Sequence, residues 1–161
     1  MVKVLIKKLR SDVELPLYKT TGASGMDLKA FVNSSITISP KTSALVPTGL
    51  SVAFSDDFEI QIRPRSGLAA KNNISVLNTP GTIDSDYRGE IKVIIYNHGT
   101  KNFVINNKDR IAQMILVPVI KMELKETEDL PETIRGEGGF GSTGKWPTSL
   151  TKKKLKSSLD K

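Results

Sequence analysis

Apolar and polar residues alternate in short segments along most of this chain, and turn residues separate the segments. The clearest case is residues 58–63, where the two kinds alternate without a break, as in a strand that buries one face. Similar segments predict strands at 2–6, 35–38, 44–54 with a break at 47–49, 74–78, 91–97, 103–105 and 110–122. Only residues 66–72 favour a helical turn or two. Short strands joined by Gly, Pro and Asn turns predict an all-β sandwich, barrel or jelly roll.

The same pattern divides the chain into parts. Residues 114–120 are apolar on both faces of the expected strand, so that strand is either covered inside the sandwich or used at a subunit interface. Beyond about Glu123 the alternation is replaced by charged residues and then by glycines. We therefore expect a single β domain at 1–125, a flexible glycine-rich arm at 126–144, and a basic tail at 145–161 that we expect to be disordered.

Composition excludes several classes of site. The chain has 161 residues, enough for one domain with a real core, and it has no cysteine for disulfides, zinc–thiolate sites or thiol catalysis. His98 is its single histidine, which disfavours a Ser-His-Asp triad or a site of several histidines. Lysines interrupt residues 1–10, and no apolar run reaches membrane-spanning length. We therefore expect a cytoplasmic protein without membrane association.

The net charge of +7 suggests a nucleic-acid partner, but its distribution argues against one. Residues 145–161 carry six lysines and Asp160, a net charge of +5, so by subtraction the other 144 residues carry about +2. The basic character belongs to a solvated tail rather than to a folded face. We expect no specific nucleic-acid partner.

Residues 81–90 form a polar bend between two predicted strands, with Asp84 and Asp86 two positions apart and Tyr87 directly after them. A hairpin with chemistry at its bend is predicted, because loops on a rigid scaffold often hold functional groups. If the bend is strand-like, both acids share one face, and a carboxylate there could hold and deprotonate a water molecule. The alternative is that both acids only form the turn.

Two further segments combine structural and functional interpretations. In residues 64–69, Ser66 is placed to be a helix N-cap, while Arg65, a hydroxyl and the first N–H groups of a helix could bind an anion. Both interpretations are compatible. Asp27 follows a glycine turn that leads into a strand. Arg110 lies at the start of the long apolar strand, where we expect it to form an ion pair with Asp109.

The glycine-rich residues 135–144 contain a literal G-x-G-x-x-G and nearly a phosphate-binding P-loop. Neither motif has its required context, because no strand precedes it, Pro147 disfavours a following helix and Trp146 occupies the Ser/Thr position. A flexible linker is one interpretation. However, Arg135 and the hydroxyl groups suit a chain of phosphates, and Phe140 suits a flat base, which favours an arm that closes over a nucleotide.

Five segments in this order resemble the homotrimeric dUTP pyrophosphatases (dUTPases), over nearly all of residues 23–144. The motifs are Ala-Ser-Gly-Met-Asp-Leu at 23–28, Pro-Arg-Ser-Gly-Leu-Ala at 64–69, Gly-Thr-Ile-Asp-Ser-Asp-Tyr-Arg-Gly at 81–89, Arg-Ile-Ala-Gln at 110–113, and Arg-Gly-Glu-Gly-Gly-Phe-Gly-Ser-Thr-Gly at 135–144. The resemblance implies a jelly-roll subunit and a trimer with shared active sites. It also implies Mg²⁺-assisted hydrolysis of dUTP to dUMP and pyrophosphate, which supplies dUMP for thymidylate synthesis and keeps uracil out of DNA.

The resemblance also implies residue roles. Asp84 would orient and deprotonate the water that attacks the α-phosphorus, and Tyr87 would lie under the deoxyribose and exclude a 2′-hydroxyl. Asp27 would neighbour the metal through water, since Mg²⁺ would be held mainly by the phosphates. The uracil would be bound by Asn78, Gly81, Thr82, Ile83 and Lys92. The phosphates would be held by Arg65, Ser66, Gly67 and Gln113. The arm would add Arg135, Phe140, Gly141, Ser142 and Thr143.

Two alternatives remain from other classes. A dCTP deaminase shares the fold but lacks the glycine-rich arm, so residues 135–144 favour hydrolysis. A nucleotide-binding jelly roll without turnover would keep the strands but could lose Asp84 or the arm, and this chain has both.

Overall fold

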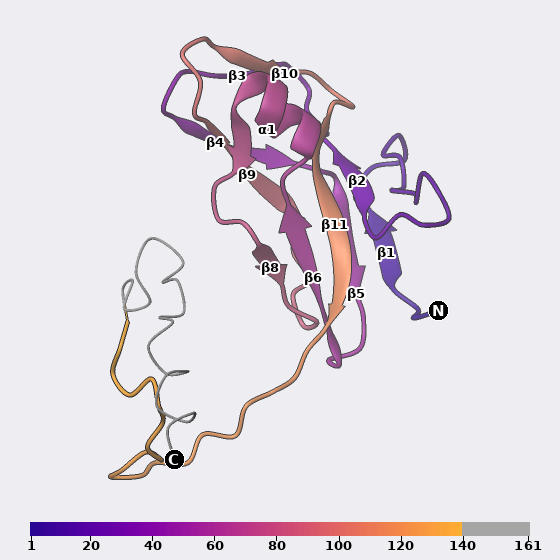
Figure 1. The fold of residues 1–161 in the computed structure, drawn as a ribbon. Coiled ribbons are helices and arrows are strands. Elements are labelled where there is room, and N and C mark those ends of the chain that lie inside the picture. The colour runs from indigo at the N-terminus through magenta and orange to yellow at the C-terminus, as the bar shows by residue number, and fades with distance from the viewer. Residues whose placement is uncertain (140–161) are drawn as a thin grey trace, which may run out of the picture. The chain divides into compact units, whose positions relative to one another are not determined.

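The structure is a computed structural model that describes residues 1–139. Residues 1–121 form one compact unit, and a second unit begins at Met122. Within residues 1–139, all strands and the one helix lie in the first unit (Figure 1). Its elements are, in chain order, β1 (Leu5–Lys8), β2 (Met26–Lys29), β3 (Ile36–Ile38), β4 (Ser43–Pro47), β5 (Leu50–Ala53), β6 (Phe58–Arg63), α1 (Ser66–Asn72), β7 (Ile74–Val76), β8 (Gly81–Ile83), β9 (Lys92–Asn97), β10 (Phe103–Ile105) and β11 (Arg110–Pro118).

The predicted all-β class and the short helix at 66–72 are confirmed, whereas several strand ends differ from the prediction. The first strand occupies Leu5–Lys8 rather than 2–6, and the last ends at Pro118 rather than at residue 122. Pro118 lacks a backbone N–H, and the last bond in the register of the β11–β6 pairing is the one that the Val119 N–H donates to the Asp57 carbonyl. Composition alone therefore overestimates the length of this strand.

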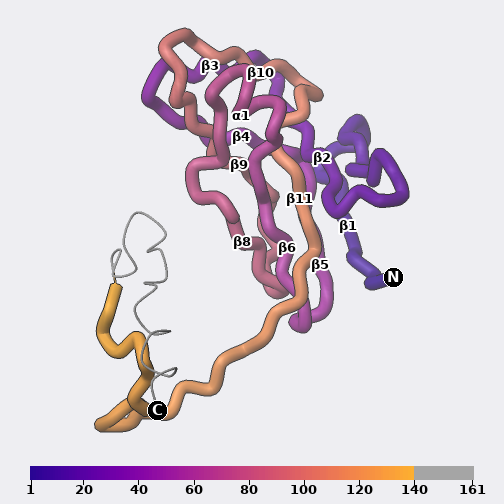
Figure 2. Tube along the Cα trace, viewed as in Figure 1, coloured from indigo at the N-terminus to yellow at the C-terminus, as the bar shows by residue number. Residues whose placement is uncertain are grey.

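The strands form two main sheets, and the path of the chain through them can be followed in Figure 2. A four-stranded sheet has the order β2-β11-β6-β8, and a three-stranded sheet has the order β4-β9-β7. Two smaller pairs, β1-β5 and β10-β3, complete the fold. Side chains from both main sheets contribute to one apolar core, including Ile60 and Ile62 of β6 and Val93 and Ile95 of β9.

Strand β6 shows why the alternation was informative. Ile60 and Ile62 are buried, while Glu59 and Gln61, which alternate with them, are only half-buried, because successive side chains of a strand point to opposite faces. Strand β11 differs, since Met114 is buried and Ile115 to Val117 on both faces are half-buried. One face of β11 is therefore covered by the core, and an apolar strip on its other face remains partly open.

The predicted hairpin exists, but its bend is more elaborate than expected. Strands β7 and β9 pair antiparallel, with Val76 opposite Ile95. The connection between them contains a further strand, β8, which leaves that sheet and pairs with β6 in the four-stranded sheet, with Ile62 opposite Gly81. Residues 81–90 therefore bridge the two sheets, which fixes the segment on both sides.

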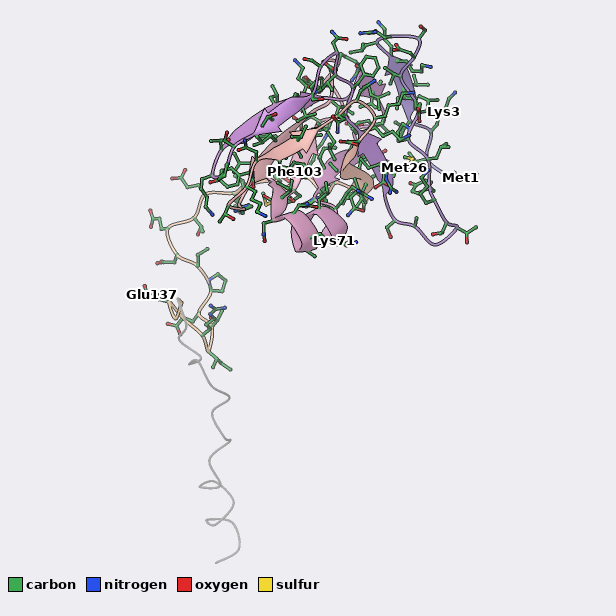
Figure 3. The ribbon with its side chains drawn as sticks, turned by 90° about the horizontal axis from the view of Figure 1, so that it is seen from above. Met1, Lys3, Met26, Lys71, Phe103 and Glu137 are labelled. Atoms are coloured by element: carbon green, nitrogen blue, oxygen red, sulfur yellow. The ribbon has the colours of Figure 1, made fainter. Side chains whose placement is uncertain are left out.

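Helix α1 lies at the edge of the strands, and none of its residues is fully buried. In Figure 3 it is the helix beside the label of Lys71. The prediction that Ser66 caps this helix is wrong. Arg65 is the N-cap, with extended backbone and no side-chain capping bond, and its carbonyl accepts the N–H groups of Leu68 and Ala69. Ser66 is thus the first helical residue, and its exposed hydroxyl is left for other partners.

The second unit is described over residues 122–139. This part contains no helix or strand, but it has turns in which Gly136 donates its N–H to Thr133 and Gly138 donates to Arg135. Within residues 1–139, no helix has both the length and the apolar character needed to cross a membrane.

Candidate active site

A pocket beside the bend, here called the hairpin pocket, gathers most of the residues predicted to bind the base and sugar. The predicted residues that line it are Asn78, Thr82, Ile83, Asp84, Tyr87 and Lys92. Leu45, Glu90 and Ile94 complete the lining and were not predicted. Gly81 lies just behind it, because a Cβ there would come within 3.2 Å of the Asn78 amide nitrogen. A side chain at position 81 would therefore crowd the Asn78 amide and shift it slightly.

Asp84 and Asp86 do not share a strand face, so that expectation is wrong. Strand β8 ends at Ile83, and the Tyr87 N–H donates to the Asp84 carbonyl at 3.1 Å, which closes a turn over residues 84–87. Asp86 lies inside this turn, as its structural interpretation predicted, whereas Asp84 opens the turn at the rim of the pocket. The Asp84 side chain is exposed, so a water molecule can reach its carboxylate.

The bend is held by the turn between β4 and β5 and by the beginning of β5. Thr48 donates its hydroxyl to the Ile91 carbonyl at 2.6 Å, and Ser51 donates to the Arg88 carbonyl at 2.7 Å. Both residues are buried, at 2% and 6% exposure. The Gly49 N–H donates to the Glu90 carboxylate at 2.8 Å. These contacts fix residues 88–91, and nothing in the sequence motifs identified them, because the partners lie far apart in the chain.

A second group of predicted residues collects where β2, β11 and the end of β6 meet. Asp27 lies opposite Gln113 in the pairing of β2 with β11. Gln113 donates to the Pro64 carbonyl at 2.9 Å, and it lines a groove with Ser66 and Thr79. A Cβ at Gly25 would lie 3.0 Å from the Gln113 side chain, which explains the glycine of the first motif.

Arg65 and Arg110 both bind Asp27. The Arg65 Nε lies 2.8 Å from Oδ1 of Asp27, and an Arg110 guanidinium nitrogen lies 3.2 Å from Oδ2. The expected ion pair between Arg110 and Asp109 is therefore wrong, since Asp109 accepts the Asn106 N–H instead. Two guanidinium groups on one carboxylate leave an excess of positive charge, which suits a phosphate chain. No motif indicates the contact of Arg110 with Asp27, because this contact depends on the pairing of β2 with β11.

The residues near Asp27 fit only an indirect role toward Mg²⁺. Within the described residues, no group of three acidic or histidine side chains could enclose a metal. Both oxygens of Asp27 already accept bonds from arginines, so a contact through water fits the site better than direct ligation. Mg²⁺ commonly keeps several waters and binds substrate phosphates, and such an ion needs no protein cage.

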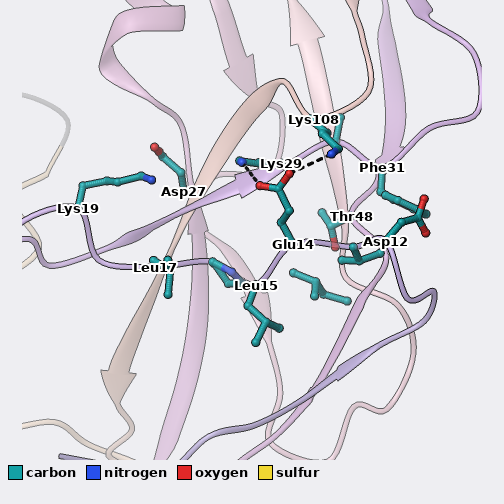
Figure 4. Close-up of a pocket in the computed structure, with 14 residues that line it drawn as sticks. Asp12, Glu14, Leu15, Leu17, Lys19, Asp27, Lys29, Phe31, Thr48 and Lys108 are labelled. Carbon is teal, nitrogen blue, oxygen red and sulfur yellow. Dashed lines mark hydrogen bonds and ion pairs between the residues drawn. The ribbon is translucent and has the colours of Figure 1, made fainter.

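A third pocket, which has Asp27 among its lining residues, was not predicted. In Figure 4 the Glu14 carboxylate lies between the amino groups of Lys29 and Lys108 and is bonded to both. The hydrogen bond from Lys29, followed by that from Lys108, lowers the pKa of Glu14 from 4.5 to about 2. The cluster keeps one net positive charge and ties the segment before β2 to Lys29 of β2 and to Lys108.

The single chain does not bring all predicted residues into one site. The hairpin pocket and the Gln113 groove share no lining residue. Gly67 follows Ser66 on an open surface, with no atom within 4 Å of a Cβ built there. Arg135 belongs to the second unit, where its Nε donates to the Gly138 carbonyl at 2.7 Å. The remaining arm residues, Phe140, Gly141, Ser142 and Thr143, lie outside the described residues.

Comparison with known proteins identifies the family. The family model described as dUTPase matches residues 11–144. The chain belongs to the dUTPase family. The family and enzyme class predicted from the sequence are therefore confirmed.

Curated relatives of this dUTPase chain agree over nearly their whole length. It is 53% identical over 143 residues to the deoxyuridine 5′-triphosphate nucleotidohydrolase of Hydrogenobaculum sp., covering 89% of this chain and 99% of the relative. It is 51% identical over 146 residues to the enzyme of the same name from Fusobacterium nucleatum, covering 90% of this chain and 100% of the relative.

Solved structures support the fold of this dUTPase chain. A mutant dUTPase of Staphylococcus bacteriophage 80alpha, solved with dUpNHpp, superimposes with a TM-score of 0.78 at 23% identity, covering 88% of this chain and 98% of that one. A mutant dUTPase from phage phi11 of S. aureus, studied for its structural Mg(II) ion, gives a TM-score of 0.73 at 19% identity, covering 81% and 99%. The predicted jelly-roll fold is confirmed.

Proposed function

We propose that this chain hydrolyses dUTP to dUMP and pyrophosphate with Mg²⁺, in a homotrimer whose active sites are shared between subunits. The observation that carries the proposal is the hairpin pocket, because it places Asp84 beside Asn78, Tyr87 and Lys92 in a chain of the dUTPase family. This single pocket offers a carboxylate for water, an aromatic ring for a sugar, and polar groups for a base.

In the proposed reaction, Asp84 accepts a proton from a water molecule whose oxygen attacks the α-phosphorus of dUTP. The bond from this phosphorus to the oxygen bridging to the β-phosphate breaks, and pyrophosphate leaves with that electron pair. General-base assistance of this kind contributes on the order of 10²–10⁴-fold to the rate. The exposed position of Asp84 at the start of the turn supports this role, because water reaches the carboxylate without displacing a protein contact.

The phosphates are proposed to bind Arg65, Ser66, Gly67 and Gln113, with Arg135 and the hydroxyl groups of the arm. The excess positive charge around Asp27 supports this assignment. Asp27 would contact Mg²⁺ through water, and the chemistry that bound Mg²⁺ supplies is neutralisation of charge on the phosphate oxygens.

Base and sugar selectivity are proposed to come from the bend itself. Backbone groups of residues 81–84 with Asn78 and Lys92 would pair with the uracil edge. Cytosine would place its amino group, a hydrogen-bond donor, opposite a donor of the protein. Both groups would then be buried without a partner, which costs binding free energy. Tyr87 would lie under the deoxyribose and leave no room for a 2′-hydroxyl.

Sharing of sites between subunits is proposed from the resemblance to the homotrimeric dUTPases. The hairpin pocket and the Gln113 groove lie on neighbouring strands, since Gln61 of the groove pairs with Thr82 of the pocket, so in this proposal each copy supplies both groups to the surface that a partner completes. The partly open apolar strip on β11 supports association. Residues 126–144 would close over the bound nucleotide, and a cytoplasmic location remains part of the proposal.

One assay tests the reaction. The protein is incubated with Mg²⁺ and each of dUTP, dCTP, dTTP and UTP, and release of pyrophosphate and monophosphate is followed. We expect fast turnover of dUTP alone. Deamination of dCTP, comparable turnover of the other nucleotides, or binding of dUTP without turnover would contradict the proposed function. Mass measurement in solution at several concentrations tests the trimer.

A further inference from the structure

The ring of Tyr87 folds back over the backbone of Gly89, two residues later. A Cβ built on Gly89 would lie 2.3 Å from the Tyr87 hydroxyl oxygen, 2.5 Å from Cζ and 2.9 Å from Cε2. Real Cβ atoms do not approach other heavy atoms so closely, because the repulsion is too strong. The space that a side chain at 89 needs is therefore occupied by the far end of the tyrosine ring.

The ring is also held by its hydroxyl group, which donates to the Glu90 carbonyl at 3.0 Å. This bond and the contact with Gly89 both act at the far end of the ring. Tyr87 is otherwise open, with 43% of its surface exposed where it lines the hairpin pocket. The orientation of the Tyr87 ring relative to the pocket therefore depends strongly on residues 89 and 90.

The backbone does not require glycine at position 89. Within the described residues, the glycines with positive φ are Gly49 and Gly136, so Gly89 lies outside the left-handed region and its backbone accepts an L-residue. Gly49 shows the contrast, since its φ is +68° and a Cβ there would lie 2.5 Å from Val13 in the core. A side chain at position 49 would therefore strain the backbone and clash with the core. At position 89 it would meet only the partly exposed ring of Tyr87.

We infer that Gly89 is a positioning residue that sets the preference for 2′-deoxyribose over ribose, because its missing side chain lets the Tyr87 ring lie in place. The inference rests on the proposed function, in which Tyr87 contacts the sugar. The Cβ of an alanine at position 89 would displace the Tyr87 ring. The hydrogen bond from the Tyr87 hydroxyl to the Glu90 carbonyl would then break. The ring can move into solvent at little cost to the fold, so selectivity falls while the protein stays folded.

The test is a double-mutant cycle with Gly89→Ala, Tyr87→Ala and the variant carrying both substitutions. Gly22→Ala is the matched control, because a Cβ at Gly22 meets no atom within 4 Å. The readout is the ratio of kcat/KM for dUTP to that for UTP, with thermal melting as a measure of folding. Calorimetric binding of dUDP and UDP gives the same ratio without turnover.

We expect Gly89→Ala to lower the dUTP/UTP ratio by about tenfold or more, which is the scale on which a poorly filled pocket loses discrimination. In the Tyr87→Ala background the same substitution should change the ratio by less than about twofold, since no ring remains to be displaced. Gly22→Ala should leave the ratio and the melting temperature unchanged.

An unchanged ratio in folded Gly89→Ala protein, or an equal loss in both backgrounds, would overturn the inference. If Gly89→Ala does not fold, the double variant decides, because removal of the ring must restore folding if the ring is the obstacle. A wild-type protein that prefers dUDP to UDP in calorimetry but hydrolyses neither triphosphate would refute the proposed reaction while leaving the role of Gly89 testable by binding.

Discussion

Thr48 offers the sharpest test of how the fold holds the hairpin pocket. Its hydroxyl donates to the Ile91 carbonyl at 2.6 Å, and the residues on both sides of this bond are buried, with Thr48 at 2% and Ile91 at 0% exposure. Thr48→Val keeps the size of the side chain but replaces the donor with a methyl group. The carbonyl then loses its partner in a place that water does not reach.

The expected cost follows from that burial. A buried carbonyl left without a donor costs about 1–3 kcal/mol. A methyl carbon also cannot stay 2.6 Å from an oxygen, so the Ile91 carbonyl must move as well. We therefore expect the upper half of that range, about 2–3 kcal/mol. With a urea m-value of roughly 1–3 kcal/mol/M, the unfolding midpoint should fall by about 1 M.

Thr42→Val is the matched control. Thr42 also donates its hydroxyl to a backbone carbonyl, that of Ser39 at 2.8 Å, but this residue is exposed. Water replaces the lost donor there, so a change within about 0.5 kcal/mol is expected. Urea unfolding of both variants should be measured at the same protein concentration, because association of subunits stabilises an oligomer. Equal midpoints for the two variants would refute the claim that burial of the Thr48 bond matters.

Three further outcomes are expected. Asp84→Asn should keep nucleotide binding in calorimetry but lower kcat for dUTP by about 10²–10⁴-fold; an unchanged kcat would remove Asp84 from the role of base. A chain truncated after Leu130 should melt like the full chain but hydrolyse little dUTP, and full activity would show that the arm is only a linker. The lysines hold the pKa of Glu14 at about 2, below its ordinary 4.5, so this group stabilises the fold above pH 4.5 and loses its effect as pH falls toward 2. Glu14→Gln should therefore melt below wild type at pH 7, with a gap that narrows in acid; a constant gap would contradict the ion-pair explanation.

Local pattern was a good guide wherever a residue's neighbours in sequence decide its environment. The alternation at 58–63 predicted β6 because one face of that strand enters the core. It failed at Ser66, where the extended Arg65 takes the N-cap position, and at Asp84 and Asp86, where a turn replaces the strand. In both places the chain changes direction, and small shifts of a boundary alter the role of each side chain.

The sequence by itself determined the all-β class, the helix at 66–72, and the family, because strand periodicity and ordered motifs are properties of the chain alone. The tertiary structure decided which distant groups meet. Arg110 binds Asp27 only because β11 pairs with β2, and Thr48 holds Ile91 only because the β4–β5 turn packs behind the bend. Such contacts depend on strand order and core packing, and no local spacing records them. The same holds for Gly89, whose place in the motif is a property of the sequence but whose steric contact with Tyr87 depends on how the turn folds.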